Sequence, residues 1–291
     1  MTDLTSAAPL LEVEDLRVHF HTPRGAVEAV RGLSFTLGRE RLGIVGESGS
    51  GKSQTGRAIL GLTAGNGRIT AKTLRFQGQD LLSLSPKQWR AVRGARMSMI
   101  MQDPKYSLNP VMTVGDQIVE AYRQHHRVSA AEARLRALAM LARVKIRDPE
   151  RVFATYPHEV SGGMGQRIMI AMMLIPEPDL IIADEPTSAL DVTVRLQVLA
   201  ILDDLVRERG MALIFISHDL PLVSSFCDRI LVMYKGRVVE DLKASELHAA
   251  RHPYTQGLLG CLPKLDQRQE TLPVLRRDPR WEHGTLEEVT R

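Results

Sequence analysis

The chain has 291 residues, 44% of them hydrophobic and 25% charged, a composition that excludes fibrous and largely disordered proteins. The formal net charge is only +4, because 38 basic residues are scattered among 34 acidic ones, which predicts a mixed solvated surface rather than a nucleic-acid-binding patch. No apolar run approaches the roughly 18 residues of a membrane-spanning helix, and no secretory signal opens the chain, so we expect a location inside the cell. Two cysteines, Cys227 and Cys261, are too few for a disulfide framework.

The first sixty residues predict two strands followed by a strand, a loop and a helix. Residues 11–20 alternate apolar and polar types, and residues 27–37 do so loosely, as expected for half-buried antiparallel strands. The apolar run at 42–45 ends at Gly46 and leads through a loop of glycine and serine into a helical pattern at 55–62. This order of elements is typical of the start of a nucleotide-binding domain.

Further buried strands are expected at 97–101, 180–183 and 213–217, where the residues are almost all apolar. Helical patterns lie between these strands. Buried strands that alternate with helices form a parallel sheet, so the sequence predicts an α/β fold.

The segment at 104–175 differs from the rest, because its patterns at 114–126 and 130–144 are helical and it has almost no strand signal. We therefore expect a helical subdomain inserted into a main domain that spans residues 10–250. The remaining residues, 251–291, are rich in proline and arginine and lose periodicity, which predicts a C-terminal extension that ends in a partly irregular tail.

The loop at 46–53 reads Gly-Glu-Ser-Gly-Ser-Gly-Lys-Ser and fits the phosphate-binding pattern G-x-x-x-x-G-K-[ST]. Its glycines let backbone N–H groups turn toward phosphate oxygens, and the helix that follows adds its positive N-terminal end. In such a loop, Lys52 would neutralise the β- and γ-phosphates, and the Ser53 hydroxyl would ligate Mg²⁺.

Two adjacent carboxylates, Asp184 and Glu185, end the apolar strand at 180–183. Ligands of open parallel sheets collect at the carboxyl ends of the strands. We expect Asp184 to hold the hydration shell of Mg²⁺ and Glu185 to accept a proton from an attacking water.

These two motifs leave kinases, GTPases, helicases and DNA-repair ATPases open, and a third feature decides among them. Ser161 precedes Gly162 and Gly163 and an apolar helical stretch at 168–175, so it occupies an N-cap position at a second anion site. One domain cannot easily place this outward-facing helix start on its own phosphate loop. A partner must therefore supply the other half of the site.

The chain resembles the ATP-binding cassette (ABC) family over about residues 11–262, with the motifs in the family's order. They are the Walker A loop (Gly46 to Ser53), the Q-loop glutamine (Gln102), the signature (Ser161 to Gln166), the Walker B strand (Leu180 to Glu185), the D-loop (Ser188 to Asp191) and the switch histidine (His218). The resemblance implies a P-loop NTPase core of RecA type with an antiparallel β subdomain and an inserted α-helical subdomain. It also implies an ATPase that works as a head-to-tail dimer, with ATP between the Walker A loop of one domain and the signature of the other.

The resemblance assigns roles to these residues. The residues expected to be catalytic are Glu185, His218, Lys52 and Gln102. Those expected to bind ATP are Gly46, Glu47, Ser48, Gly49, Ser50, Gly51, Lys52, Ser53, Gln54, Ser161, Gly162, Gly163 and Asp191. Those expected to hold Mg²⁺ are Ser53, Gln102 and Asp184. Phe20 is our candidate for stacking on adenine, although a core aromatic residue would also fit there.

Within the family, the chain looks like the ATPase subunits of bacterial dipeptide, oligopeptide and nickel importers. The diagnostic stretches are Ala183 to Thr187 with Ala189 to Thr193, and His252 to Thr255 with Gly257 to Leu259. The likeness implies as partners a second ATPase subunit (a paralogue or a copy of this chain), two membrane permeases and a periplasmic or lipid-anchored solute-binding protein, with no nucleic acid. It implies a peripheral location at the cytoplasmic face of the inner membrane.

Some features depart from these relatives and leave the solute open. Gly165 stands where they usually carry a basic residue, and the turn at 38–41 is one residue shorter than expected. Cys261 has no cysteine cluster around it, so an iron–sulfur site is not carried over. Peptides are the favoured solute, with nickel, metal chelates or opine-like compounds as the alternative. A soluble ABC ATPase that acts on DNA or the ribosome is a more remote alternative, and the sequence shows none of the coiled coils, zinc fingers or second cassette that it predicts.

Overall fold

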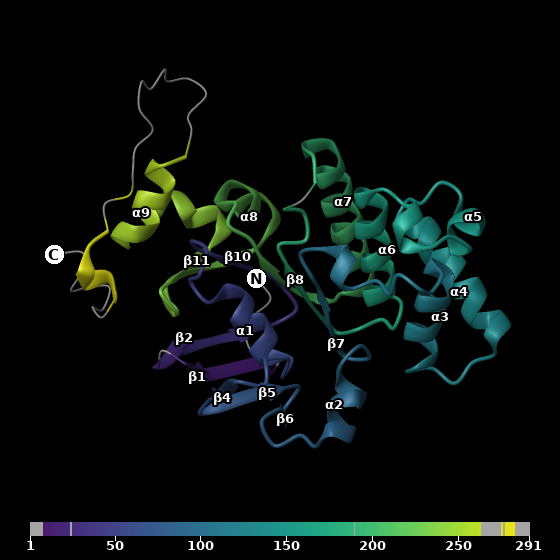
Figure 1. Cartoon of the computed structure of the whole chain (residues 1–291). Coiled ribbons are helices and arrows are strands. Elements are labelled where there is room, and N and C mark those ends of the chain that lie inside the picture. Colours follow the sequence, from purple (N-terminus) through teal and green to yellow (C-terminus); the bar gives the residue numbers. More distant parts are fainter. Residues whose placement is uncertain (1–7, 24, 189, 263–274, 276, 283–291) are drawn as a thin grey trace, which may run out of the picture. The chain divides into compact units, whose positions relative to one another are not determined.

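The computed structural model describes residues 8–23, 25–188, 190–262, 275 and 277–282 (Figure 1). The chain divides into two compact units, which we call unit 1 (residues 1–82 and 215–291) and unit 2 (residues 83–214). The segment expected to be a helical insertion, 104–175, belongs to unit 2. Among the described helices, none combines the length and the apolar character that crossing a bilayer requires.

Unit 1 contains an antiparallel sheet of five strands in the order β2-β1-β5-β6, with β4 also paired to β1. The strands are β1 (Leu11–Thr22), β2 (Gly25–Leu37), β4 (Gly67–Thr70), β5 (Thr73–Phe76) and β6 (Gln79–Asp80). The alternating pattern of the sequence correctly predicted the first two of them.

A bulge at Asp15 explains why the apolar pattern of β1 slips by one residue. Asp15 has a φ angle of 49°, and the pairing of β1 with β2 shifts register between Val13 and Leu16. Val13, Leu16 and Val18 are consequently all buried, with exposed fractions of 4%, 0% and 0%, although their spacing is first three and then two.

The rest of unit 1 is built around β3 (Arg41–Val45), which lies parallel to β10 (Arg229–Tyr234). A Cβ atom at Gly43 would lie 2.1 Å from Cγ1 of Val223, which belongs to helix α8 (Leu220–Phe226). This helix therefore packs directly against β3. The other elements are α1 (Lys52–Ile59), β11 (Arg237–Lys243), which is antiparallel to β10, and three further helical segments, η3 (Ala244–Ala249), α9 (Pro253–Gly260) and η4 (Pro279–Glu282).

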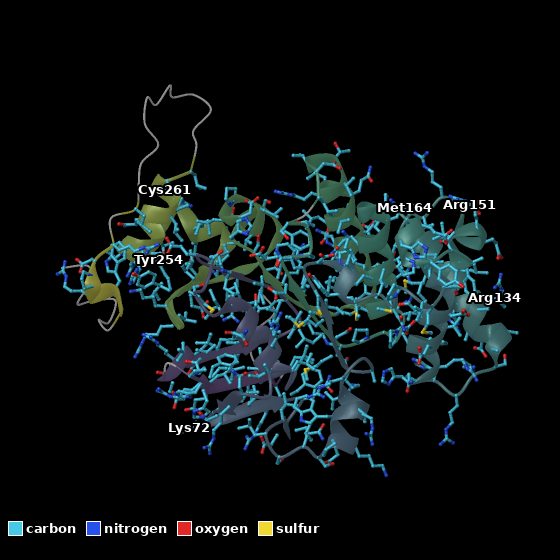
Figure 2. The ribbon with its side chains drawn as sticks, viewed as in Figure 1. Lys72, Arg134, Arg151, Met164, Tyr254 and Cys261 are labelled. Atoms are coloured by element: carbon cyan, nitrogen blue, oxygen red, sulfur yellow. The ribbon has the colours of Figure 1, made fainter. Side chains whose placement is uncertain are left out.

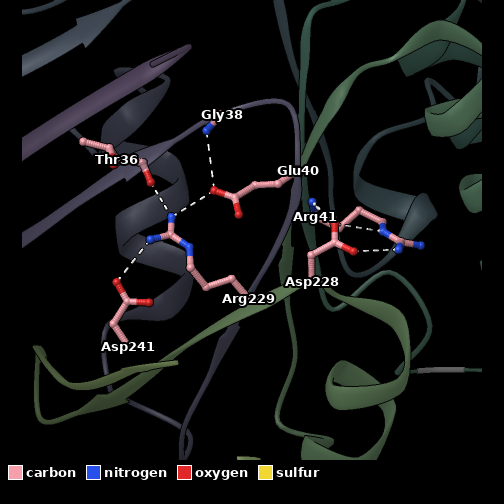
Figure 3. A network of polar contacts seen from close by, with 7 residues as sticks. All are labelled: Thr36, Gly38, Glu40, Arg41, Asp228, Arg229 and Asp241. Carbon is pink, nitrogen blue, oxygen red and sulfur yellow. Dashed lines mark hydrogen bonds and ion pairs between the residues drawn. The ribbon is translucent and has the colours of Figure 1, made fainter. Parts of the chain in front are cut away.

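Two arginines tie the turn at 38–41 to β10 and β11 (Figure 3). The Arg229 guanidinium pairs with Glu40 at 3.0 Å and with Asp241 at 3.2 Å, and it donates to the carbonyl oxygen of Thr36. Arg41 pairs with Asp228 at 2.8 Å. The shortened turn that the sequence left unexplained is therefore held by charged neighbours in unit 1.

The extension begins with a helix. We expected residues 252–262 to resemble the family and the partly irregular tail to follow them, and we predicted no helix there, but α9 forms at Pro253–Gly260. Tyr254 and Thr255 are fully buried, because unit 1 packs around them. Most of the chain beyond residue 262 lies outside the described residues.

Unit 2 contains two parallel buried strands, β7 (Met97–Ile100) and β8 (Leu180–Asp184), paired from Met97 with Leu180 onward. The strand β9 (Ala212–Ile216) lies at the end of unit 2, and its last two residues are assigned to unit 1. The helical elements are α2 (Pro86–Val92), η1 (Pro104–Tyr106), α3 (Val114–Arg123), α4 (Ala130–Arg143), α5 (Pro149–Phe153), η2 (Pro157–Glu159), α6 (Gly162–Leu174) and α7 (Val192–Arg209).

Side-chain caps start the long helices of unit 2. Thr113, Ser129, Ser161 and Asp191 each accept a hydrogen bond from the backbone N–H three residues later, at the starts of α3, α4, α6 and α7. Apolar faces hold the helices together, and Ile118, Leu141 and Ile168 are fully buried. The cap at Ser161 was predicted, but α6 begins six residues earlier than the apolar stretch at 168–175 suggested.

Candidate functional site

The loop at 46–53 leaves room only for glycine at two of its positions. A Cβ atom at Gly46 would lie 2.2 Å from the carbonyl oxygen of Met233, and one at Gly51 would lie 2.4 Å from that of Ala29. Both residues also have positive φ angles, 150° and 100°. At Gly49, with φ of 81°, a Cβ atom would meet no heavy atom of the described residues within 4 Å. The loop is thus tightly supported on one side and open at Gly49.

Lys52 holds the loop from within. Its ammonium group donates to the carbonyl oxygens of Gly46 (2.7 Å) and Glu47 (2.8 Å), with the Ser50 hydroxyl at 3.4 Å. Lys52 is only 5% exposed, so its charge is enclosed by the loop. A phosphate bound by this loop would meet the ammonium directly.

Helix α1 begins beside this charge. Its N-cap is Gly51 in the left-handed conformation, no side chain of the described residues caps it, and its first turn holds no acidic residue. Lys52, Ser53 and Gln54 are its first three residues. A helix start of this kind favours an anion through its backbone N–H groups and its dipole.

A neighbour that the sequence did not reveal supports the loop. The turn after β10 places Gly236 so that its N–H donates to the carbonyl oxygen of Ser50 at 2.9 Å, while its own carbonyl accepts from Arg31 at 2.7 Å. These partners are far apart along the chain, so no local pattern could have indicated them.

His218 and Phe20 are the other candidates in unit 1. His218 follows β9 and is exposed. Hydrogen bonds hold the residues on either side of it. The backbone N–H of Asp219 donates to the Ser217 hydroxyl at 3.0 Å, and the Asp219 carboxylate accepts from the backbone N–H of Leu222 at the start of α8. Phe20 lies in β1 and is half-buried, and a Cβ atom at Gly67 would lie 2.8 Å from its ring. The ring edge therefore packs against β4.

Asp184 and Glu185 lie where β8 ends in unit 2. Asp184 is 6% exposed, and Glu185 has a φ angle of 46°, in the left-handed region that non-glycine residues seldom occupy. The N–H and hydroxyl of Ser188 both donate to the carbonyl oxygen of Glu185, at 3.3 Å and 3.2 Å, and hold this turn. Strained backbone of this kind gathers at functional sites.

Ser161, Gly163 and Asp191 come together where α6 and α7 begin. Ser161 accepts from the N–H of Met164 at 3.4 Å, and Asp191 accepts from that of Val194 at 2.9 Å. A Cβ atom at Gly163 would lie 2.7 Å from Cγ1 of Val194, so the two helix starts are in direct contact. A Cβ atom at Gly162 would meet nothing within 4 Å among the described residues.

A groove of about 830 Å³ opens beside Ser161 and Met164. Figure 2 labels Met164 and Arg151 of this groove. Among the residues that the structure describes, four basic side chains and one acid, Asp148, line it; the basic ones are Lys145, Arg147, Arg151 and Arg167. Burial, and then the charge of Arg147, lowers the pKa of Arg167. The start of α6 thus lies in positive surroundings that suit an anion.

Gln102 follows β7 and is exposed. The next residue, Asp103, caps η1 by accepting from the N–H of Lys105 at 2.9 Å. A Cβ atom at Gly165 would lie 3.6 Å from Cγ of Pro104, an ordinary contact. The segment after Gln102 therefore packs on α6, and the space at Gly165 would accept a Cβ atom.

The expected nucleotide and metal ligands divide between the units, with Lys52, Ser53 and His218 in unit 1 and Gln102, Asp184, Glu185 and Ser161 in unit 2. Within the described residues, no three His, Cys, Asp or Glu side chains gather as a metal site. Mg²⁺ usually takes one or two protein oxygens and completes its shell with phosphate and water. The Ser53 hydroxyl and the Asp184 carboxylate are donors of that kind.

The chain is similar to known proteins over most of its length. A family model described as "ABC transporter" matches residues 30–188. The oligopeptide transport ATP-binding protein OppD of Salmonella typhimurium is 49% identical over 93% of this chain and 81% of its own length.

Two solved structures share the fold. One is the dimeric post-hydrolysis structure of the ATP-binding cassette MJ0796 bound to ADP and Pi, with a TM-score of 0.73 and 25% identity over 80% of this chain and 98% of that one. The other is cbiO1 of Clostridium perfringens, part of the ABC transporter complex cbiONQ, with a TM-score of 0.71 and 26% identity over 84% and 92%. Both are ABC ATPase folds, as the motifs implied.

Proposed function

The chain belongs to the ABC transporter family, and from this premise we propose that it is the ATP-hydrolysing subunit of an importer for peptides. The observation that carries the proposal is the likeness to an oligopeptide transport ATP-binding protein over 93% of the chain. The phosphate loop around Lys52 and the helix start at Ser161 supply the two anion-binding surfaces that such a subunit needs.

ATP would lie between two ATPase subunits. The loop at 46–53 of one subunit would hold the phosphates, and the start of α6 in the second subunit would close over the γ-phosphate. The uncovered space at Gly162 and the basic groove beside Ser161 support this arrangement. A relative of the same fold forms a dimer bound to ADP and Pi, which also supports it.

Glu185 would accept the proton of the attacking water, and His218 would orient that water against the γ-phosphate. Lys52 and Ser161 of the second subunit would stabilise the charge that develops on the phosphate oxygens. Bound Mg²⁺ would supply further positive charge there, held by Ser53 and Asp184, with Gln102 near its hydration shell.

The partners and location follow from this role. Two permeases in the membrane would dock on unit 2 at the cytoplasmic face, and a binding protein outside would deliver the solute to them. Closure on ATP and opening after phosphate release would then drive the permeases between their states.

The change Glu185→Gln tests the chemistry. It removes the proton acceptor and keeps the size and shape of the side chain, so ATP affinity should stay within about twofold while phosphate release falls by about 10² to 10⁴. The matched control is Glu132→Gln in the exposed first turn of α4, which should behave as wild type. A wild-type rate of ATP hydrolysis in Glu185→Gln would show that Glu185 is not the proton acceptor.

The solute is tested on the assembled importer with its binding protein, by measuring which solutes raise the ATPase rate. Short peptides should stimulate it. Stimulation by nickel or opine-like compounds instead would contradict the assignment of peptides, and tight, salt-sensitive DNA binding without membrane association would contradict transport altogether.

A further inference from the structure

The C-terminal extension folds back on unit 1 around one tyrosine. Tyr254, in the first turn of α9, is fully buried, and His252 before it is 1% exposed (Figure 2 labels Tyr254). A Cβ atom at Gly257 would lie 2.1 Å from Cδ1 of Leu275, so residue 275 packs on α9. Residue 275 of the extension is therefore packed on the helix that carries Tyr254.

Other aromatic rings fix the orientation of Tyr254. The centroid of its ring lies 4.6 Å from that of Tyr234 in β10 and 6.0 Å from that of Trp281. Trp281 also meets the rings of Tyr234 and His252, at 6.0 Å and 6.3 Å. A ring enclosed in this way cannot change its rotamer, so the position of its hydroxyl is fixed.

That hydroxyl meets the phosphate loop. The backbone N–H of Glu47, the second residue of the loop, donates to the Tyr254 hydroxyl at 3.1 Å. Burial raises the pKa of Tyr254 to about 12, so the phenol is neutral at physiological pH. The carboxylate of Glu47 pairs with Arg277 at 3.1 Å, although the Arg277 side chain is 61% exposed. The extension thus holds both the backbone and the side chain of Glu47.

Lys52 also contacts Glu47, because its ammonium donates to the carbonyl oxygen of that residue at 2.8 Å. A bound phosphate would draw part of this ammonium's interaction away from the loop. The contact from Tyr254 does not involve the ammonium, so it can keep Glu47 in place when nucleotide binds.

We propose that Tyr254, with a smaller contribution from Arg277, is a positioning residue that keeps the phosphate loop in its nucleotide-binding shape, so that the C-terminal extension sets nucleotide affinity. This inference rests on the proposed function, since it takes the loop to bind ATP and ADP. A loop that is ordered before binding does not have to be ordered by the ligand, and the ligand binds more tightly for that reason. Catalytic groups such as Glu185 are not involved, so the effect falls on affinity rather than on the chemical step.

The test is Tyr254→Phe in the full chain, measured by calorimetric titration with MgADP. The change keeps the ring in its cluster and leaves the Glu47 N–H without its acceptor, so ADP should bind about tenfold more weakly. The KM for ATP should rise by a similar factor while kcat stays within about twofold. The matched control is Tyr234→Phe, which removes a phenolic oxygen from the same aromatic cluster but not the one that meets Glu47; its affinity should equal that of wild type.

Arg277→Gln gives a second measurement that does not depend on a buried site. Its effect on ADP affinity should be small, about twofold at low salt, and should vanish at high salt, because the ion pair is exposed. Wild-type affinity in Tyr254→Phe, or an equal loss in Tyr254→Phe and Tyr234→Phe, would overturn the inference. Failure of the wild-type chain to bind MgADP would overturn the proposed function instead.

Discussion

Two glycines near the start of α6 lie two positions apart in different surroundings. A Cβ atom at Gly163 would lie 2.7 Å from Val194, whereas one at Gly165 would make an ordinary contact with Pro104 at 3.6 Å. Neither position requires a positive φ angle. Substitution by alanine should therefore change the stability of the protein in opposite directions at the two sites.

We expect Gly163→Ala to destabilise the protein by about 1–3 kcal/mol, because the start of α7 must move away to admit the methyl group. Gly165→Ala should instead stabilise it by about 0.5–1 kcal/mol, since alanine loses less backbone entropy than glycine in a helix. Chemical unfolding of both variants under identical conditions measures the difference. Equal stabilities would show that the two helix starts are not in contact as described.

At the scale of an element, the start of α9 depends on a neutral histidine. The Nδ1 atom of His252 accepts from the N–H of Tyr254 at 3.1 Å, which requires an unprotonated nitrogen. Burial lowers the pKa of His252 below its ordinary value of 6.5, and the carboxylate of Glu240, which accepts from the N–H of His252, opposes this in part. Protonation would thus remove the cap of α9.

The unfolded chain binds this proton more readily than the folded chain, so stability from His252 is fully present above pH 6.5 and is lost as the pH falls through the lower folded pKa. The slope should reach at most about 1.4 kcal/mol per pH unit. His252→Asn, whose side chain caps helices without titrating, should reduce this slope in unfolding measurements between pH 5 and 8. Some slope should remain, because burial also lowers the pKa of His125. An unchanged slope would contradict the role of His252.

How well the sequence predicted each element depends on how local its causes are. The strands β1 and β8 follow from alternation and from an unbroken apolar run, and the cap of α6 follows from Ser161 and the glycines after it. Helix α9 was missed because glycines interrupt its pattern and its stability comes from packing around Tyr254. The contact between Glu47 and Tyr254 joins residues 207 positions apart, and no spacing along the chain encodes it.

At the scale of the whole molecule, the chain has two unlike helix starts that we propose bind phosphate, one at α1 and one at α6. They belong to different units, and each is half of a composite ATP site in the proposed dimer. If the site needs both halves from different copies, damage to one half in one chain can be compensated by an intact half in another.

This compensation can be measured by mixing Lys52→Ala, which damages the phosphate loop, with Ser161→Ala, which damages the opposing helix start. Each variant alone should lose most ATPase activity, because every site in its dimers contains a damaged half. In an equimolar mixture, half of the dimers combine the two variants and each of these has one intact site, so about a quarter of wild-type activity should return. The return should weaken on dilution, as dimers dissociate. Activity in either variant alone that matches wild type, or a mixture no more active than its parts, would contradict a site shared between two copies of this chain.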